Sequence, residues 1–366
     1  MHIITCEQVS SGHPDKICDQ IADAIVTDVL AHDSKARVAA EVMIKGNQII
    51  IAGELTSTYA PDYRELVRSV FERIGIDRLG YEESVFDIHI LMDRQSPDIA
   101  LGVDRGGAGD QGMMYGYATN ETPELLPIPY VLATDFLRIL EKHPSHMFRA
   151  DAKAQVSFDY DSGRITTFLC SVQHSPDVEP GDFRHVIESI MVLAAARLGL
   201  NTDFEKLVNP TGRFVLGGPF ADCGVTGRKL ACDTYGGVGR IGGGAMSGKD
   251  PTKVDRSGAY IARKIARDIV CAGYADRCEV QIAYAIGVAE PVSLRVESFG
   301  TGKISDEAMT KLLRDSCDMT PGGIIRKFGL RRPIYSATAR NGHFGIEEYP
   351  WEATDLAQQL RKAANV

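Results

Sequence analysis

The 366-residue sequence lacks the excess of positive charge that marks many nucleic-acid-binding proteins. Its 40 lysines and arginines stand against 49 aspartates and glutamates, giving a formal net charge of -9. No apolar stretch approaches the roughly 20 residues that a membrane-spanning helix needs, and the first residues show no secretory signal pattern. We therefore expect a cytoplasmic protein that binds neither nucleic acid nor membrane, although a local basic cluster could still bind an anion.

Paired cysteine motifs are also absent. None of the eight cysteines forms a C-x-x-C pair, and no histidine pair lies near them at zinc-site spacing. We expect reduced thiols that serve as small apolar residues. The cysteines are Cys6, Cys18, Cys170, Cys223, Cys232, Cys271, Cys278 and Cys317.

The chain does contain a recurring order of elements, and its length suggests two or three structural units. In the first copy, apolar residues at i, i+4 spacing predict a helix over 14–30. A Gly-Asn turn then joins predicted strands over 37–44 and 48–56. A second helix begins near Pro61 and ends at Gly75, which is a typical helix stop.

The same order of helix, hairpin and helix returns twice. In the second copy, helices span 129–141 and 182–198, and strands span 154–160 and 164–172. In the third copy, Asp250 caps a helix from Pro251 to residue 272, strands span 279–288 and 292–299, and a helix follows Ser305. A spacing of roughly 120 residues is too long for a solenoid. We interpret the pattern as three related α+β units around a common centre, with coincidence as the alternative.

The first hairpin has apolar residues on both faces. With a two-residue turn at Gly46-Asn47, Glu41 pairs Ala52, and Glu54 lies diagonal to Glu41 on the same face, about 7–8 Å away. Two carboxylates on an otherwise apolar face are costly unless they are paired or bind a cation. A second subunit could cover this face, which favours an obligate oligomer. A partly exposed face with ordinary salt bridges is the alternative.

The segment Gly12-His13-Pro14-Asp15-Lys16 combines several features of a phosphate site. Glycine allows close approach of the backbone to a ligand, and the helix behind it offers free N–H groups. The aspartate suits Mg²⁺, and the histidine and lysine can donate to phosphate. Taken alone, an ordinary start of a helix is the simpler interpretation.

The glycine-rich segment 242–253 resembles two nucleotide fingerprints without fitting either. From Gly243 it matches G-x-x-x-x-G-K, but Asp250 stands where a P-loop has Ser or Thr and would repel phosphate. Residues 237–242 match G-x-G-x-x-G, but no helix opens directly after them. We therefore reject both the Walker A motif and the dinucleotide fingerprint.

An anion site is still indicated, because glycines precede a helix start that Lys249 and Lys253 flank. Asp255 is a candidate metal ligand near the same helix end. A solvated surface loop is the alternative. Further cations stand at element ends, where binding sites usually lie; they are Lys153, Arg213, Arg228 and Lys229. The segment 102–112 contains five glycines and is typical of a mobile lid, with a plain flexible loop as the alternative.

Together these residues resemble the S-adenosylmethionine synthetase (methionine adenosyltransferase) family. The matching segments follow the family order over nearly the whole chain, and the glycine-rich block and the Gly-Ala-Gly-Asp-Gln-Gly hexapeptide are the most specific. They are 12–16, 109–112, 116–121, 151–153, 209–214, 222–229, 242–256 and 343–345. The loop 103–109 is shorter than in typical bacterial members, and the resemblance is thin over 74–92 and 176–208.

The resemblance implies three structurally similar α+β domains around a pseudo-threefold axis. We expect an N-terminal domain over 1–100, discontinuous and interleaved with later segments. A central domain over 101–225 would begin with the glycine-rich lid, and a C-terminal domain over 226–366 would carry the phosphate loop. The resemblance also implies a homodimer with shared active sites, usually paired into a homotetramer.

The implied reaction converts ATP, L-methionine and water into S-adenosylmethionine, phosphate and diphosphate. The methionine sulfur attacks the ribose C5′, triphosphate leaves, and the triphosphate is then hydrolysed. Two Mg²⁺ ions per active site and one activating K⁺ are implied as cofactors.

The resemblance assigns roles to individual residues by matching position. The catalytic residues would be His13, Lys153, Arg228 and Lys249. The ATP-binding residues would be His13, Asp151, Ala152, Lys153, Arg213, Phe214, Asp222, Arg228, Lys229, Ala245 and Lys249. The methionine-binding residues would be Glu54, Gln95, Asp110, Asp222 and Lys253. The metal ligands would be Asp15 and Asp255 for Mg²⁺ and Glu41 for K⁺.

The residue inventory suits this reaction, because a thioether sulfur has no proton to lose and needs no general base. Expelling triphosphate instead calls for electrostatic stabilisation by cations. A phosphotransferase that uses ATP is the alternative enzyme. A non-catalytic nucleotide-binding protein is the alternative outside enzymes, and it would be expected to have lost one of the residues His13, Asp15, Lys153, Lys249 and Asp255, which are all present.

Overall fold

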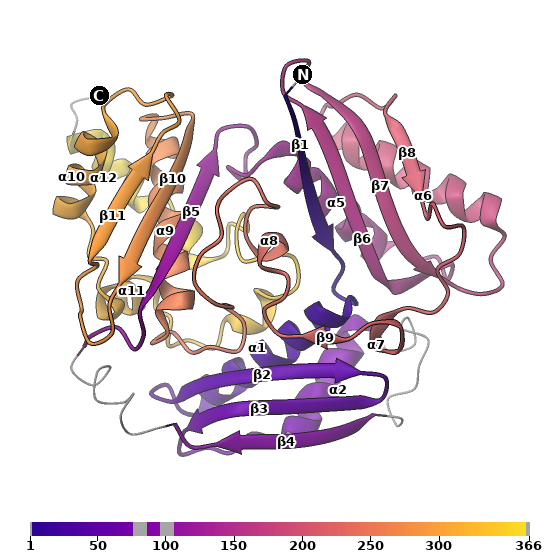
Figure 1. Ribbon diagram of the computed structural model, residues 1–366, viewed down its shortest axis with the longest axis horizontal. Helices are drawn as coiled ribbons and strands as arrows, with labels where there is room; N and C mark the ends of the chain where they lie inside the picture. Colours follow the sequence, from indigo (N-terminus) through magenta and orange to yellow (C-terminus); the bar gives the residue numbers. More distant parts are fainter. Residues whose placement is uncertain (1, 76–85, 96–105, 364–366) are drawn as a thin grey trace.

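The computed structural model describes residues 2–75, 86–95 and 106–363. Three β-sheets are arranged around a central region of loops that includes the short helix α8 (Figure 1). The long helices lie behind the sheets in this view, so each sheet has one face covered by helices and one face open. In the described part of the chain, no helix is long and apolar enough to cross a bilayer.

The first sheet has the strand order β4-β3-β2-β9. Its elements are α1 (Pro14–His32), β2 (Arg37–Lys45), β3 (Gln48–Thr56), α2 (Tyr63–Ile74), β4 (Asp87–Asp93) and β9 (Gly224–Val225). Alternate residues of β2 are buried towards α1, and Val38, Val42 and Ile44 are at most 1% exposed. The predicted hairpin register is confirmed, since Glu41 lies opposite Ala52.

The second sheet has the order β1-β6-β7-β8. Its elements are β1 (Ile3–Val9), α5 (Ile128–Lys142), β6 (Phe148–Asp159), β7 (Arg164–His174), α6 (Pro180–Arg197) and β8 (Glu205–Val208). Helices α5 and α6 pack an apolar core against one face, around Phe136, Phe168 and Met191. The strand β6 begins six residues earlier than the predicted 154, and it thereby carries residues 151–153 into the sheet.

The third sheet has the order β11-β10-β5. Its elements are β5 (Gly112–Thr119), α9 (Val254–Ala272), β10 (Arg277–Tyr284), β11 (Ser293–Glu297), α10 (Asp306–Ser316), α11 (Pro321–Phe328) and α12 (Asp355–Ala363). Short helices complete the chain: α7 (Gly218–Ala221), α8 (Leu230–Asp233), η2 (Tyr335–Ala337) and η3 (Pro350–Glu352). Ser305 caps α10 as predicted, because its hydroxyl accepts the Ala308 N–H.

The predicted start of the third-copy helix is wrong. Asp250 does not cap α9, which begins at Val254 with Lys253 at its N-cap. The Asp250 carboxylate instead accepts the N–H groups of Val38 and Thr252, so it joins the glycine-rich segment to β2. The strands β10 and β11 are also shorter than predicted, because residues 285–292 form the connection between them.

The sheets exchange strands across the chain. The first strand, β1, pairs with β6 of the second sheet, β5 pairs with β10 of the third sheet, and β9 pairs with β2 of the first. The three-unit α+β architecture predicted from the repeat is therefore confirmed, and the units are interleaved. The exact domain boundaries stay a prediction.

Candidate active site

The turn that leads into α1 is held from both sides. The Ser10 hydroxyl donates to the Ala150 carbonyl at 2.6 Å, and the Gln20 amide donates to the Ser11 carbonyl at 2.8 Å. A Cβ atom on Gly12 would lie 2.5 Å from the Ala150 oxygen, so only glycine fits between α1 and β6. This close packing brings the start of α1 against the strand that carries Lys153.

His13 caps α1 and is a neutral donor in this position. Its Nδ1 accepts the Asp15 N–H at 3.2 Å, which assigns the ring proton to Nε2. Burial, followed by the nearby charge of Lys229, lowers the pKa of His13 to about 3, against the opposing effect of Asp15. The imidazole therefore stays uncharged at neutral pH and offers one N–H group to a ligand.

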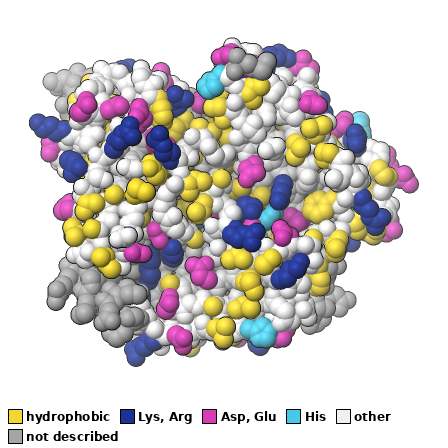
Figure 2. Space-filling model, in the orientation of Figure 1, with side chains coloured by type: hydrophobic (Ala, Val, Ile, Leu, Met, Phe, Trp, Pro, Cys, Tyr) yellow, Lys and Arg dark blue, Asp and Glu magenta, His cyan; other side chains and the backbone are white. Residues whose placement is uncertain are grey.

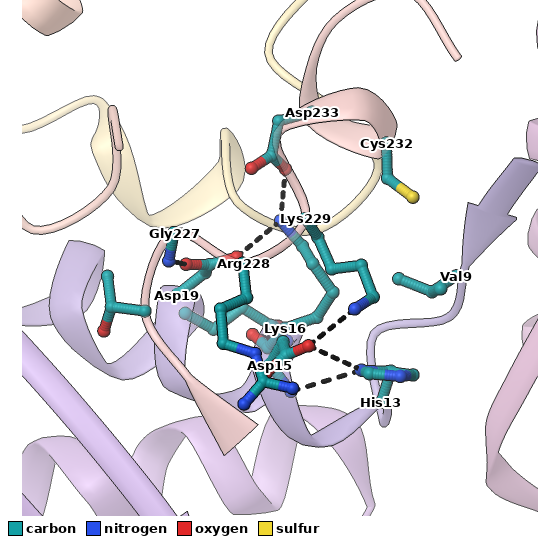
Figure 3. A network of polar contacts seen from close by, with 12 residues as sticks. Val9, His13, Asp15, Lys16, Asp19, Gly227, Arg228, Lys229, Cys232 and Asp233 are labelled. Carbon is teal, nitrogen blue, oxygen red and sulfur yellow. Dashed lines mark hydrogen bonds and ion pairs between the residues drawn. The ribbon is translucent and has the colours of Figure 1, made fainter. Parts of the chain in front are cut away.

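Asp15 lies at the centre of a group of cations (Figure 3). Its Oδ2 is 2.6 Å from the Lys229 Nζ, its Oδ1 is 3.5 Å from the Arg228 Nε, and Oδ1 also accepts the Val225 N–H. Burial alone would raise the pKa of Asp15, but the hydrogen bonds from Lys229 and Val225 outweigh it and hold the pKa below its ordinary value. The side chain is 1% exposed and ionised, so it attracts cations to the end of α1.

A cleft of about 320 Å³ opens beside this helix end. Six residues predicted from the sequence to bind ATP line it: His13, Asp151, Lys153, Arg213, Phe214 and Asp222. Burial raises the pKa of Asp151 to about 6, although its Oδ2 accepts the Gly218 N–H. Lys153 and Asp222 are exposed at the cleft, where they can meet a ligand.

Two other residues that were predicted to bind ATP, Ala152 and Ala245, do not line this cleft. Ala152 has its side chain in the core of the second sheet, and both of its backbone groups bond Ser10. Ala245 lies in the glycine-rich segment, and its Cβ is 2.4 Å from where a Cβ on Gly227 would stand. The segments 224–229 and 242–249 therefore touch each other.

A second polar cluster surrounds the start of α9. The Lys249 Nζ is 2.7 Å from the Asp255 Oδ2, and the Asp255 Oδ1 accepts the Gly244 N–H at 2.9 Å. A Cβ on Gly244 would lie 2.8 Å from the Lys249 Nζ, so glycine makes room for this ion pair. Lys253 contacts Asp250 at 2.5 Å instead of Asp255. The predicted anion site therefore contains two lysines, Lys249 and Lys253. It also contains the Asp255 carboxylate, which faces the glycine-rich loop.

The carboxylates of the first hairpin lie beside this second cluster. Glu41 and Glu54 are exposed on the open face of the sheet, on diagonal positions as predicted. Desolvation by the surrounding chain raises the pKa of Glu41, and the charge of Lys249 opposes this shift. Glu41 is therefore a carboxylate that a cation would stabilise, close to the Lys249 loop.

Two of the residues predicted to bind the substrate methionine lie at the edges of the described segments. The Gln95 N–H donates to the Thr56 hydroxyl at the end of β3, and Asp110 is exposed at the start of β5. Ala108 forms a bridge to Ile286, which anchors the last residues of the glycine-rich segment. The rest of the predicted lid, residues 102–105, lies outside the described residues.

The two polar clusters occupy separate places along one edge of β2. Val225, which binds Asp15, pairs with Met43 of β2, whereas Lys249 pairs with Ala39. Four residues of strand separate these positions by about 13 Å. Within the described residues, no hydrogen bond or ion pair links His13 or Asp15 to Lys249 or Asp255. Figure 2 shows the face of the molecule seen in Figure 1, where Lys and Arg side chains gather with acidic side chains and a histidine among hydrophobic patches.

A buried network beneath both clusters was not found from the sequence. Asp15, Asp19 and Asp23 follow one another at four-residue spacing on α1, and each accepts a backbone N–H from a site loop. The donors are Val225, Gly227 and Gly248, respectively. Arg256 makes a two-pronged contact with Asp23 at 2.7 Å. The spacing of these aspartates is visible in the sequence and indicates one polar stripe on the helix.

Comparison with protein-family models shows to which family the chain belongs. Three family models match consecutive parts of the chain: the N-terminal domain of S-adenosylmethionine synthetase over residues 1–97, the central domain over 105–214, and the C-terminal domain over 216–353. The chain belongs to the S-adenosylmethionine synthetase family. This synthetase is a methionine adenosyltransferase, which binds ATP and methionine and belongs to a family that uses metal ions.

The carboxylates of the synthetase suit metal binding through the nucleotide. Within the described residues, no group of three or more His, Cys, Asp or Glu side chains could hold a metal by itself. Mg²⁺ usually takes one or two carboxylates together with substrate phosphates and waters. Asp15 and Asp255 each have one oxygen fixed by a backbone N–H and the other on a lysine. The lysine-bound oxygen of each would become free for a metal when the lysine turns to phosphate.

Proposed function

We propose that the synthetase makes S-adenosylmethionine by direct attack of the methionine sulfur on the ribose C5′, with the two polar clusters binding the leaving triphosphate. The sulfur is a neutral nucleophile without a proton to lose, so no base is needed. Charge develops on the departing triphosphate, and its stabilisation should dominate catalysis. The observation that supports this proposal is the set of cations around the His13 cleft and the Lys249 loop.

His13 has the role of a neutral hydrogen-bond donor to the departing triphosphate. Its Nδ1 is occupied by the Asp15 N–H, so Nε2–H remains for the ligand. Lys153, Arg228 and Lys229 bind phosphate oxygens from the cleft side, and Lys249 binds them from the glycine-rich loop. Phe214, Arg213 and Asp151 hold the adenosine, with Asp222 placed between nucleotide and methionine.

The proposed metal ligands are Asp15 and Asp255 for two Mg²⁺ ions and Glu41 for one K⁺. When bound, Mg²⁺ neutralises charge on the triphosphate and favours its departure. Both aspartates are held by backbone N–H groups, so they keep their positions when their lysine partners move. Glu54, Gln95, Asp110 and Lys253 complete the site as methionine-binding residues.

We propose further that each active site is shared between two protomers. The two clusters of one chain meet β2 at positions about 13 Å apart, and the open face of this sheet carries exposed apolar side chains beside its carboxylates. Met43 is 38% exposed and Leu91 is 62% exposed on this face. A twofold axis would place the His13 cleft of one protomer against the Lys249 loop of its partner, since such interfaces are isologous. Pairing of two such dimers would give the expected tetramer.

A single-turnover assay tests the proposed displacement. The enzyme is mixed with methionine, Mg²⁺ and an ATP analogue whose β–γ bridging oxygen is replaced by nitrogen. Direct displacement yields one sulfonium product and one intact imidotriphosphate per site, because the sulfur displaces the whole triphosphate and the imido bridge resists the hydrolysis that would otherwise follow. Formation of a nucleoside diphosphate or its imido analogue before the sulfonium product would contradict the proposal.

A further inference from the structure

Lys16 is a fully buried cation that directly follows Asp15, the proposed metal ligand, on α1. It is 1% exposed, and its Nζ contacts the carboxylates of both Asp19, at 3.0 Å, and Asp233. Through these two ion pairs Lys16 bridges α1 to α8 (Figure 3).

Both acidic residues paired with Lys16 are also tied to the segment that carries the proposed phosphate-binding cations, Asp19 by its carboxylate and Asp233 by its backbone. The Asp19 Oδ1 accepts the Gly227 N–H at 2.8 Å, and the Asp233 N–H donates to the Lys229 carbonyl at 2.9 Å. Arg228 and Lys229 therefore lie between two anchors, one directly before them and one at the end of α8. The positive φ of Gly227, 76°, turns the chain at the first anchor.

We propose that Lys16 is a positioning residue, which with Asp19 and Asp233 holds Arg228 and Lys229 against Asp15. This inference rests on the proposed role of Arg228 and Lys229 as triphosphate ligands. Lys16 lies beneath the cleft and does not line it, so it acts through the segment 227–233 and not on the substrate. Without the Lys16 bridge, the end of α8 loses its ionic link to α1, and the Arg228–Lys229 segment gains freedom to move.

The opposite view, that Lys16 only stabilises the fold, has a matched control in the same chain. Lys264 on α9 is also 1% exposed and also bridges two carboxylates, Asp268 at 2.8 Å and Asp355 at 2.5 Å. It contacts no residue of either polar cluster in the described part of the chain. Lys264→Met therefore reports what loss of a buried, doubly paired lysine does to the fold alone.

The test compares Lys16→Met and Lys264→Met in the full-length enzyme. For each variant we would measure the thermal midpoint, kcat, the KM values for ATP and methionine, and inhibition by inorganic triphosphate. Both variants should lose thermal stability. Only Lys16→Met should lower kcat and triphosphate affinity, by about 10- to 100-fold, because a misplaced ligand costs this much. Native triphosphate affinity in Lys16→Met would overturn the inference.

A double variant keeps the test decisive if the single variant folds poorly. Lys16→Met/Asp233→Asn removes one cation and one carboxylate, so the net charge of the buried group is unchanged while the bridge between α1 and α8 is lost. We expect it to recover thermal stability but to keep weak triphosphate binding. If both thermal stability and triphosphate binding recovered, Lys16 would only balance charge, and the positioning role would be overturned.

A third variant separates this inference from the proposed function. Lys229→Met should weaken triphosphate binding directly if Lys229 is a ligand. Weak binding in Lys229→Met together with native binding in Lys16→Met overturns the positioning role alone. Native binding in Lys229→Met overturns the proposed role of Lys229 and the inference that depends on it.

Discussion

Replacing Lys249 by alanine should remove one cation from the departing triphosphate while leaving the fold intact. A unit charge about 4 Å from a phosphate oxygen contributes about 4 kcal/mol at an effective dielectric constant of about 20. Loss of one donor to developing charge in other enzymes lowers kcat by about 10²- to 10³-fold. We expect a decrease of this size for Lys249→Ala, because the Lys249 side chain is 17% exposed and lies in the glycine-rich loop.

The cost to stability should be far smaller. Lys249 loses only its pair with Asp255, which is 18% exposed and keeps its hydrogen bond from Gly244. Partly solvated pairs of this kind contribute about 1 kcal/mol or less. Lys327→Ala, which breaks a 2.8 Å pair with Asp355 away from the site, is the matched control and should keep native turnover. The assay is sulfonium production at saturating ATP and methionine, and a native kcat for Lys249→Ala would refute its role.

Three further predictions address the helix end, the cleft and the open face. Gly12→Ala should lower kcat at least about tenfold and the free energy of unfolding by about 1–3 kcal/mol, because its Cβ would lie 2.5 Å from the Ala150 oxygen; unchanged kinetics would contradict this. Because burial raises the pKa of Asp151 to about 6, ionisation above that pH costs the folded state up to about 3 kcal/mol. Asp151→Asn should therefore raise the urea midpoint at pH 7.5 and leave it unchanged at pH 4, whereas an equal shift at both would exclude this cause. Leu91→Arg, at a 62% exposed site on the open face, should give inactive monomers in analytical ultracentrifugation, and an active monomer would argue against shared sites.

Much of the fold could be predicted from local patterns. The hairpin at Gly46-Asn47 set its own register, and the apolar spacing over 14–30 correctly predicted the helix α1. The strand exchange was less accessible, because β1 pairs with β6 more than 140 residues later and no local signal reports such a distant partner. Asp250 misled the prediction of the α9 start, since its carboxylate bonds Val38 of a different unit.

The chemistry of the site was visible as residue types, but its geometry was not. Gly12, His13 and Asp15 could be named from one pentapeptide, whereas their separation from Lys249 along β2 depends on strand pairing. Lys16 was noted only as a possible phosphate donor, and the structure instead buries it between two aspartates. Such burial depends on packing of distant segments, which a single sequence does not reveal.

The most direct test of the central claim, that each site combines the two clusters from two protomers, uses mixed dimers. Lys229→Met disables the cleft cluster, and Lys249→Ala disables the loop cluster, so each homodimer should be inactive. The two chains are co-expressed with different tags and the mixed dimer is isolated. A shared site predicts about half of native activity, because one of its two sites combines two unaltered clusters. A mixed dimer as inactive as its parents would place both clusters of a site in one chain and contradict the account.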